Sequence, residues 1–378
     1  MPASIKDGDP VRVIVVGGGI AGLTAAIALR NHGHDVRVLE AREDTSAGAG
    51  ISLWPNALAA LDRIGVGDAV RSSGGAVTAG AMRWRDGSWI RRPDPGRLVD
   101  ALGEPLVVIE RATLRDVLAG MLPPGTVQFG VRVDGSAGLD ADLIVGADGT
   151  RSVLARELNG SLPHTYAGYT AWRGIADAGF DPTLAGEVLG PGGQFGLVPL
   201  GPDRTYWFAT ARLPESTAFD DEAAYVRGLV DGWADPLPRL VAATDPDDLL
   251  RNDLYDRPTA KVLHRGRVVL VGDAAHPMRP HLGQGGCQAI EDAVTLAECI
   301  GTGDDLPRAT MRYASVRRRR IRAVVRESEL IGRVVNGRPA AVWEALIRSS
   351  VLVPDVVVRA HLATIASRHA FSRTLESW

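Results

Sequence analysis

The sequence begins with a strand, turn, helix and strand pattern that carries three glycines at fixed spacing. The stretch VRVIVVGGGIAGLTAAIALRNHGHDVRVLEAR predicts a buried strand, a glycine turn, a helix and a second strand, over residues 11–16, 17–19, 20–31 and 36–39. Gly17, Gly19 and Gly22 match the G-x-G-x-x-G spacing. The first glycine permits a tight turn, the second lets a pyrophosphate approach the backbone, and the third lets the helix pack closely on the strand.

The second strand ends at Glu40, 18 residues after Gly22, near the spacing of a carboxylate that accepts hydrogen bonds from ribose hydroxyls. Free N–H groups and the dipole at the helix N-terminus favour an anion. The pattern therefore predicts a dinucleotide site. The chain carries one such fingerprint, because DLIVGADGTRSVLARE (142–157) leads a strand into Gly146 and Gly149 without a second G-x-G-x-x-G. An enzyme with a separate nicotinamide fingerprint, of the glutathione reductase type, is not indicated.

A third pattern lies in RVVLVGDAAHPMRPHLGQGGCQAIEDAVTLAECI, residues 267–300. Asp273 directly follows a buried strand, at the strand end where open α/β sheets bind ligands. The glycine-rich turn 283–286 precedes a predicted helix whose buried face comprises Ile290, Ala293, Val294, Ala297 and Ile300. These residues predict a second ligand-facing turn.

Length and composition exclude several classes of protein. The 378 residues are 45% apolar with a pI near 6.3, which is typical of a globular protein and gives no indication of nucleic-acid binding. No stretch offers the roughly 20 apolar residues of a membrane helix, and residues 1–10 lack the apolar core of a signal peptide, so a cytoplasmic location is expected. Cys287 and Cys299 fall in one predicted helix, about 18 Å apart at 1.5 Å per residue, and cannot form a disulfide there. We assign no metal ligands.

Together, the fingerprint, the GADG motif with Arg151 and Arg156 after it, and GDAAHPMRPHLGQGG resemble the class A FAD-dependent monooxygenases, the aromatic hydroxylases with the para-hydroxybenzoate hydroxylase fold. Four further stretches resemble the branch of urate, salicylate and 3-hydroxybenzoate 6-hydroxylases and zeaxanthin epoxidase. They are GAGISLWPNALAALDRIGV (48–66), IERATLRDVL (109–118), GYTAWRG (168–174) and GQGGCQAIEDAVTLA (283–297).

The resemblance implies an α/β fold with a Rossmann-like, GR2-type FAD-binding domain and a second, mostly antiparallel β-sheet substrate domain. We expect the FAD-binding domain over 1–75, 104–163 and 256–335, and the substrate domain over 76–103 and 164–255. Within the latter, AMRWRDGSWIRR reads as a hairpin with its turn at Asp86–Gly87. Residues 336–378 are expected to be C-terminal helices that either cover the substrate domain or form a dimer contact.

The resemblance also places FAD contacts on this sequence. Asp273 would bind the ribityl hydroxyls, and the helix that follows the turn 283–286 would direct its N-terminus at the flavin N1 and C2 carbonyl, where reduced flavin is negative. Arg42 would lie near phosphate or adenine, and Arg111 near the ribityl phosphate; the alternative for both arginines is an ordinary surface ion pair. The full set of expected contacts is Gly17, Gly19, Ala21, Gly22, Glu40, Arg42, Ser52, Arg111, Val131, Asp148, Asp273, Pro280, Gly283, Gln284, Gly285 and Gly286.

For the reaction, the resemblance implies that NADPH or NADH reduces FAD, and that a C4a-hydroperoxyflavin formed with O₂ hydroxylates a small aromatic substrate. His281 is the leading candidate for a base that deprotonates the substrate. Arg204, Tyr206 and Arg173 are further substrate candidates, although strand alternation leaves the face of Arg173 open. Alternatives are an FAD-dependent epoxidase, a reductase of an unsaturated substrate, or an FAD-binding protein without turnover. A halogenase is not indicated, because W-x-W-x-I-P is absent. We expect a monomer or homodimer.

Two residue clusters allow more than one interpretation. Eleven of the 20 aromatic residues lie between Tyr166 and Trp233, which fits either a site that sandwiches an apolar ring or the preference of strands for aromatic residues. The run Arg317–Arg320 lies in a predicted helix, and we interpret it as a solvated helix face rather than a nucleic-acid site.

Overall fold

The computed structural model describes residues 10–43, 49–191, 193–301, 305–336 and 339–376. A six-stranded sheet holds the fingerprint, in the strand order β15-β16-β9-β1-β2-β8. Its strands are β1 (Arg12–Val16), β2 (Asp35–Leu39), β8 (Val127–Gln128), β9 (Leu143–Gly146), β15 (His264–Arg265) and β16 (Val268–Leu270). All neighbouring strands run parallel except β15 and β16. The parallel, buried strands confirm the predicted Rossmann-like α/β fold.

A three-stranded sheet adjoins this core, in the order β3-β7-β4, with β3 at Gly50–Leu53, β4 at Gly75–Val77 and β7 at Leu106–Glu110. The helices near these two sheets are α1 (Ile20–Asn31), α2 (Pro55–Arg63), α3 (Gly67–Ser73), α5 (Arg111–Gly120) and α6 (Val153–Asn159). Helix α1 coincides with the helix predicted from the fingerprint.

The seven-stranded sheet has the order β14-β10-β13-β12-β11-β5-β6, and its pairs are antiparallel except β11 with β5. Its strands are β5 (Ala81–Trp84), β6 (Trp89–Arg91), β10 (Thr165–Ala176), β11 (Gly186–Gly190), β12 (Gly193–Pro199), β13 (Thr205–Ala211) and β14 (Leu250–Asp256). Strands β5 and β6 form the predicted hairpin, with Gly87 at φ +86° in its turn. The short segments around the sheet are α4 (Pro95–Leu102), η1 (Pro182–Leu184), α7 (Glu222–Leu229), α8 (Leu237–Ala242) and η2 (Pro246–Asp248).

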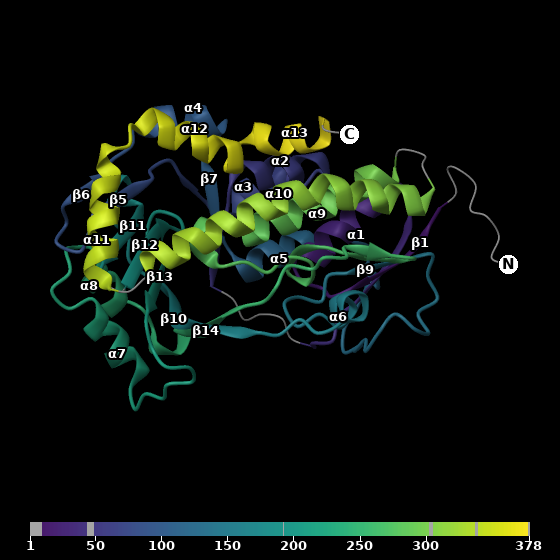
Figure 1. The fold of residues 1–378 in the computed structure, drawn as a ribbon, viewed down its shortest axis with the longest axis horizontal. Coiled ribbons are helices and arrows are strands. Elements are labelled where there is room, and N and C mark those ends of the chain that lie inside the picture. The colour runs from purple at the N-terminus through teal and green to yellow at the C-terminus, as the bar shows by residue number, and fades with distance from the viewer. Residues whose placement is uncertain (1–9, 44–48, 192, 302–304, 337–338, 377–378) are drawn as a thin grey trace.

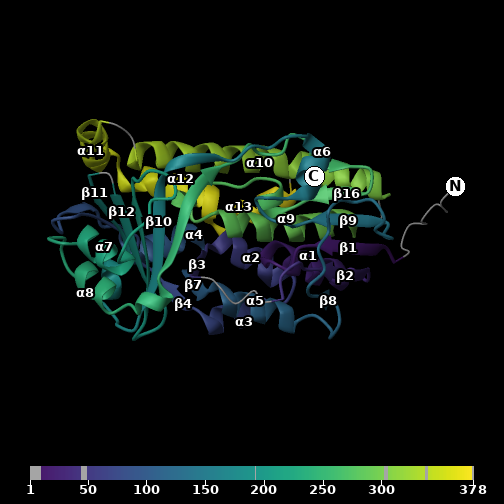
Figure 2. The ribbon, with the colours of Figure 1, turned by 90° about the horizontal axis from the view of Figure 1, so that it is seen from below.

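Most of the clustered aromatic residues serve the core of this sheet. Trp172, Phe195 and Trp207 are buried against α7 and α8, with Phe219, Tyr225 and Trp233 packed around them. Figure 2 shows α7 and α8 against the sheet at the end of the molecule away from the N-terminus. Alternation along the strands places Tyr169, Tyr206 and Phe208 on the opposite face. Most of the cluster is therefore structural, and Tyr169, Tyr206 and Phe208 stay the candidates for a site that sandwiches a ring.

Two long helices connect the sheets. Helix α9 (Gly285–Ile300) packs against α1, α2 and α10 (Leu306–Val335), and Figure 1 shows α10 running past α9 between the ends of the molecule. Both cysteines lie in α9, which confirms that one helix carries them, and both are buried. The turns η3 (Gly272–Ala274) and η4 (Pro280–Leu282) precede α9, and the C-terminal region forms α11 (Ala340–Ser349), η5 (Ser350–Leu352), α12 (Asp355–Ala366) and α13 (Arg368–Glu376).

The interpretation of Arg317–Arg320 as a solvated face is wrong for Arg317. Its side chain is 0% exposed and pairs with Glu291 and Asp292 of α9, and Arg320 pairs with Glu291. Only Arg318 and Arg319 in the run are exposed. The run therefore straddles the boundary between the core and the surface of α10.

The C-terminal helices leave apolar side chains in solvent. Exposed large apolar residues are Val342, Leu346, Val351, Leu352, Val353, Val356 and Val357. Over the described residues, no single helix is long and apolar enough to span a membrane; only the pair Val342–Leu352 and Asp355–Ala366, bent by 103°, meets the length and composition criteria jointly.

Candidate functional site

The turn between β1 and α1 brings backbone segments together more closely than any side chain allows. Gly17 has φ +107°, and a Cβ there would lie 2.4 Å from the Ala147 oxygen. A Cβ at Gly22 would lie 1.9 Å from the Gly17 oxygen, whereas nothing lies within 4 Å of a Cβ at Gly19. Helix α1 has no side-chain cap at its N-terminus. The turn thus leaves free N–H donors beside an open space, which suits a phosphate.

Glu40, at the carboxyl end of β2, lies directly beside this turn. Its carboxylate accepts hydrogen bonds from the Gly18 N–H (2.6 Å) and the Arg42 N–H (2.8 Å), and its backbone oxygen accepts from the Val131 N–H (2.9 Å). The structure therefore gathers the expected contacts Glu40, Arg42 and Val131 at one edge of the sheet. Because each carboxylate oxygen has two lone pairs, Glu40 keeps acceptor capacity for a further donor.

The GADG motif after β9 and the turn after β16 lie against the β1–α1 turn, on the side of β1 away from β2 and Glu40. Gly272, with φ +60°, approaches α1 so closely that a Cβ there would lie 2.9 Å from the Ala21 Cβ. Asp148 accepts hydrogen bonds from the Val153 N–H (2.8 Å) and the Leu154 N–H (3.4 Å) at the start of α6. The Asp148 Oδ1 atom is buried and has no hydrogen-bond partner in the described part of the chain.

A buried cation, Arg257, lies among these carboxylates and was not predicted from the sequence. Its guanidinium donates to the backbone oxygens of Ala274 (2.8 Å) and Thr150 (3.2 Å). Burial lowers the pKa of Arg257, an effect opposed by Asp273 and Asp148. The arginine therefore ties the GADG loop to the turn that carries Asp273. Arg257 directly follows β14, and this position was the one available signal.

The second glycine turn, 283–286, is equally constrained. A Cβ at Gly283 (φ +60°) would lie 2.9 Å from the Trp54 Nε1 atom and 4.0 Å from the Ser52 Cβ, and one at Gly286 would lie 2.7 Å from the Ile51 Cδ1 atom. Gln284 is buried, Pro280 is exposed, and Gly285 begins α9, which has no side-chain cap. The Trp54 Nε1 atom is buried without a hydrogen-bond partner among the described residues. This indole N–H is a donor beside the turn 283–286 and, like Arg257, was not predicted from the sequence.

The seven-stranded sheet directs the face opposite α7 and α8 at this turn, where it contacts His281. The His281 Nδ1 atom lies 3.1 Å from the Gln194 Oε1 atom of β12, and Nε2 lies 2.9 Å from the Tyr169 hydroxyl of β10. Burial and Arg279 lower the pKa of His281 to about 4, and burial raises the pKa of Tyr169 to about 12. The imidazole is therefore neutral near pH 7, with Nδ1–H donating to Gln194 and Nε2 accepting from Tyr169.

Arg173 lies on the same face, which resolves the question left by the sequence. It pairs in register with Phe208 and donates to the Asn252 Oδ1 atom (2.6 Å). The ring of Tyr206 covers Gly50, where an added Cβ would lie 2.5 Å from it. Burial raises the pKa of Tyr206, opposed by a hydrogen bond with Arg173 and by the charge of Arg111. The structure thus brings together Arg173, Tyr206 and Arg111.

Arg204 lies apart from this group. It forms ion pairs with Glu110 (2.6 Å) and Asp177 (3.4 Å), and its side chain is 44% exposed. A groove of about 820 Å³ lies between the GADG loop and β14, with Arg42, Asp148, Arg151, Arg251 and Asn252 among its lining residues.

Comparisons with known proteins agree with this geometry. A family model described as an FAD binding domain matches residues 125–328, and a model described as an NAD(P)-binding Rossmann-like domain matches residues 15–51. The chain is 38% identical to the aurachin C monooxygenase/isomerase of Stigmatella aurantiaca, over 89% of this chain and 93% of that protein. It is 34% identical to an FAD-dependent urate hydroxylase of Klebsiella pneumoniae, with the same two coverages. The chain belongs to the class A FAD-dependent monooxygenases.

The solved structures agree with this assignment. The crystal structure of Klebsiella pneumoniae HpxO complexed with FAD and uric acid superimposes with a TM-score of 0.87 at 29% identity, covering 94% of this chain and 96% of that one. The cofactor of this class A monooxygenase is FAD, and the described residues fit it. The N-termini of α1 and α9 have no side-chain cap, and Asp148 Oδ1 and Trp54 Nε1 are buried without a partner among the described residues; all four lie in or beside segments that the sequence assigned to FAD.

Substituting Gly17 should impair FAD binding. In Gly17→Ala, the new Cβ meets the Ala147 oxygen in a conformation that is strained for alanine, so the turn must move. We expect FAD to bind about tenfold more weakly or worse, measured by fluorescence titration of the apoprotein. Gly120→Ala, where nothing lies within 4 Å of the added Cβ, is the matched control. Equal FAD affinities in the two variants would contradict the prediction.

Proposed function

We propose that this monooxygenase hydroxylates a small aromatic or heteroaromatic compound with an acidic group or ionisable hydroxyl, using NADPH or NADH and O₂. The observation that carries the proposal is the face of the seven-stranded sheet opposite α7 and α8. There, Tyr169, Tyr206 and Phe208 lie with Arg173 and His281 next to the turn 283–286. Aromatic surface with a few convergent polar groups is typical of a site for a small ring. The names of the urate hydroxylase relatives support a heteroaromatic substrate.

Bound FAD would accept electrons from the nicotinamide and activate O₂, and the chain positions the reactants. We assign the FAD contacts to the sequence-predicted set and propose that the uncapped N-terminus of α9 stabilises negative charge on the ring. The division into an FAD-binding domain and a substrate domain, and a monomeric or homodimeric state, also stay proposals.

Arg173 is the candidate for binding an anionic group of the substrate. Its guanidinium makes one hydrogen bond to Asn252 at 2.6 Å and lies beside the Tyr206 hydroxyl. A guanidinium can bind a carboxylate or oxyanion through the N–H groups that remain. Arg204 stays a weaker candidate, since Glu110 and Asp177 already engage it.

His281 is the candidate for accepting the substrate proton. Its neutral imidazole carries one lone pair, at Nε2, which faces the Tyr169 hydroxyl. A substrate hydroxyl that displaces Tyr169, or bonds to it, would transfer its proton to Nε2, directly or through the phenol. Arg279 beside the ring disfavours a lasting imidazolium, so the proton must move on.

Anaerobic reduction tests the proposed function. The purified protein with bound FAD is mixed with NADPH or NADH, with and without hydroxylated aromatic acids and purines, and flavin absorbance is followed. We expect reduction that a matching compound accelerates, followed by its hydroxylation when O₂ is admitted. If neither nicotinamide reduces the flavin under any condition, the monooxygenase proposal fails, and a reductase with another electron donor or a protein without turnover becomes the better reading. Reduction without hydroxylation of a bound unsaturated compound would favour the epoxidase or reductase alternatives.

Arg173→Met should weaken substrate binding more than Arg204→Met. A charge-assisted hydrogen bond lost from a partly buried site corresponds to about tenfold to hundredfold in KM for an anionic substrate. Loss of the exposed pairs of Arg204 should change KM little. Steady-state kinetics of both variants measure the difference, and the reverse order would reassign the substrate cation to Arg204.

His281→Ala should lower kcat by about 10² to 10⁴ fold for a substrate that must lose a proton. Because burial lowers the pKa of His281 to about 4, the neutral acceptor persists well below pH 6.5. The acid limb of kcat/KM should therefore centre near pH 4 and should be absent in the variant. His369→Ala, on an exposed histidine, is the control. An unchanged rate and pH profile in His281→Ala would exclude this role.

A further inference from the structure

Helix α9 carries two consecutive carboxylates that are completely buried. Glu291 and Asp292 are each 0% exposed. Consecutive helical residues point about 100° apart, so the two side chains reach different neighbours. Buried charges are tolerated only with full pairing and hydrogen bonding. Their partners therefore show what these residues hold in place.

Asp292 holds the turn that presents Asp273. Its Oδ2 atom accepts from the Gly272 N–H at 2.8 Å and lies 2.5 Å from the His276 Nε2 atom, and its Oδ1 atom accepts from the Arg317 Nε at 2.6 Å. Gly272 immediately precedes Asp273 and has φ +60°. One carboxylate thus fixes both ends of the segment 272–276.

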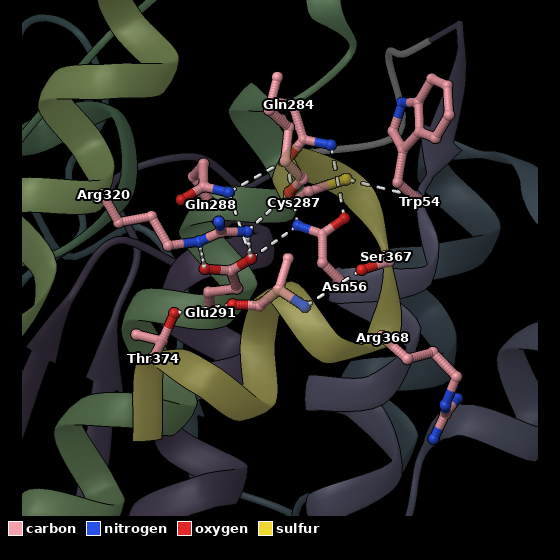
Figure 3. Close-up of polar contacts among 12 residues, drawn as sticks. Trp54, Asn56, Gln284, Cys287, Gln288, Glu291, Arg320, Ser367, Arg368 and Thr374 are labelled. Atoms are coloured by element: carbon pink, nitrogen blue, oxygen red, sulfur yellow. Dashed lines mark hydrogen bonds and ion pairs between the residues drawn. The ribbon is translucent and has the colours of Figure 1, made fainter. Parts of the chain in front are cut away.

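Glu291 holds the other turn, 283–286. Its Oε1 atom accepts from the Asn56 Nδ2 at 2.6 Å, and Asn56 donates in turn to the Gln284 Oε1 atom at 3.0 Å. Figure 3 shows Asn56 between Glu291 and Gln284, with Arg320 on the far side of the carboxylate. Gln284 lies inside the glycine turn, so Glu291 acts on that turn through one amide.

Arg317 of α10 connects the two carboxylates. Besides Asp292, its guanidinium contacts the Glu291 Oε2 atom through Nη1 (2.5 Å) and the Gln288 Oε1 atom through Nη2 (2.8 Å). Burial lowers the pKa of Arg317, but Asp292 and Glu291 outweigh burial, and the net shift is upward. Pairing with Arg320 and Arg317 overcomes burial and lowers the pKa of Glu291 to about 2. All three groups are charged near pH 7, and only the planar fork of an arginine reaches both carboxylates at once.

We propose that Arg317 is a positioning residue that sets, through Asp292 and Glu291, the relative placement of the segments 272–273 and 283–286, between which the flavin end of FAD is held. The inference rests on the FAD contacts assigned under the proposed function. One residue, Asp292, links Arg317 to Gly272, and two residues, Glu291 and Asn56, link it to Gln284. Its loss should therefore change the environment of the bound flavin as well as the stability of the fold.

The test compares Arg317→Lys, Arg317→Met and Asp292→Asn with Arg319→Met, an exposed arginine two residues away. Asn has a single oxygen acceptor, so Asp292→Asn must weaken the contact with either Gly272 or Arg317 while side-chain size is kept. For each protein, the FAD dissociation constant, the visible flavin spectrum and the flavin midpoint potential are measured, and the melting temperature is recorded with and without FAD.

We expect the substituted core variants to bind FAD at least tenfold more weakly and to shift the flavin spectrum and midpoint potential, with Arg317→Lys closer to the unsubstituted protein than Arg317→Met. Arg319→Met should match the unsubstituted protein. If Arg317→Met does not fold, Asp292→Asn decides. Folded variants with a lower melting temperature but unchanged affinity, spectrum and potential would overturn the inference, because Arg317 would then serve stability alone. Failure of the unsubstituted protein to bind FAD would instead overturn the proposed function and, with it, the premise of this inference.

Discussion

The neutralisation of charge around α9 is the constraint on which the rest of the structure depends. The helix packs against α1, α2 and α10, and of its 16 residues only Gly285, Gly286 and Glu298 are not buried. A helix enclosed on all sides would normally be apolar. This one carries Glu291 and Asp292, so α10 must supply Arg317 and Arg320 at matching positions. These ion pairs require α10 to lie beside α9. They also fix the C-terminal segment, because the Ile365 oxygen accepts from Arg320 at 2.8 Å.

Much of the fold was readable from local sequence, because the decisive positions are set by short-range sterics. Gly17 and Gly22 must be glycine because backbone meets backbone there, and the strand β16 that leads into Asp273 and a glycine turn was recognisable from local sequence. The parallel sheet, the hairpin around Gly87 and the helix with both cysteines followed from such patterns. The assignment of residues to FAD contacts and to substrate contacts stays a prediction.

The parts that sequence reasoning missed depend on long-range pairing. The run Arg317–Arg320 contains one residue on the buried stripe of α10, in register with Tyr313, Ile321 and Val324, and that spacing was the available signal. What it could not reveal was the presence of two carboxylates on α9 opposite Arg317. Arg173 and Arg204 differ for a related reason. Pairing with Phe208 fixes the face of Arg173, whereas Arg204 precedes β13 and turns to Glu110 at the end of β7, a contact that local alternation does not predict.

Burial and the neighbouring arginine act in the same sense on His281, whereas burial and the neighbouring arginines oppose each other at Tyr206. This difference affects how a proton and an anion are stabilised in the candidate substrate site. At His281, burial and the neighbouring Arg279 both disfavour the cation, so the imidazole is a neutral acceptor. Around Tyr206, by contrast, the charges of Arg173 and Arg111 favour negative charge against the effect of burial. A substrate that lies between these groups would be stabilised as its anion mainly by guanidinium groups rather than by an imidazolium. A fixed guanidinium stabilises the anion more strongly than an imidazolium that forms only when the proton is transferred. The reason is that fixed charges need no reorganisation during the reaction.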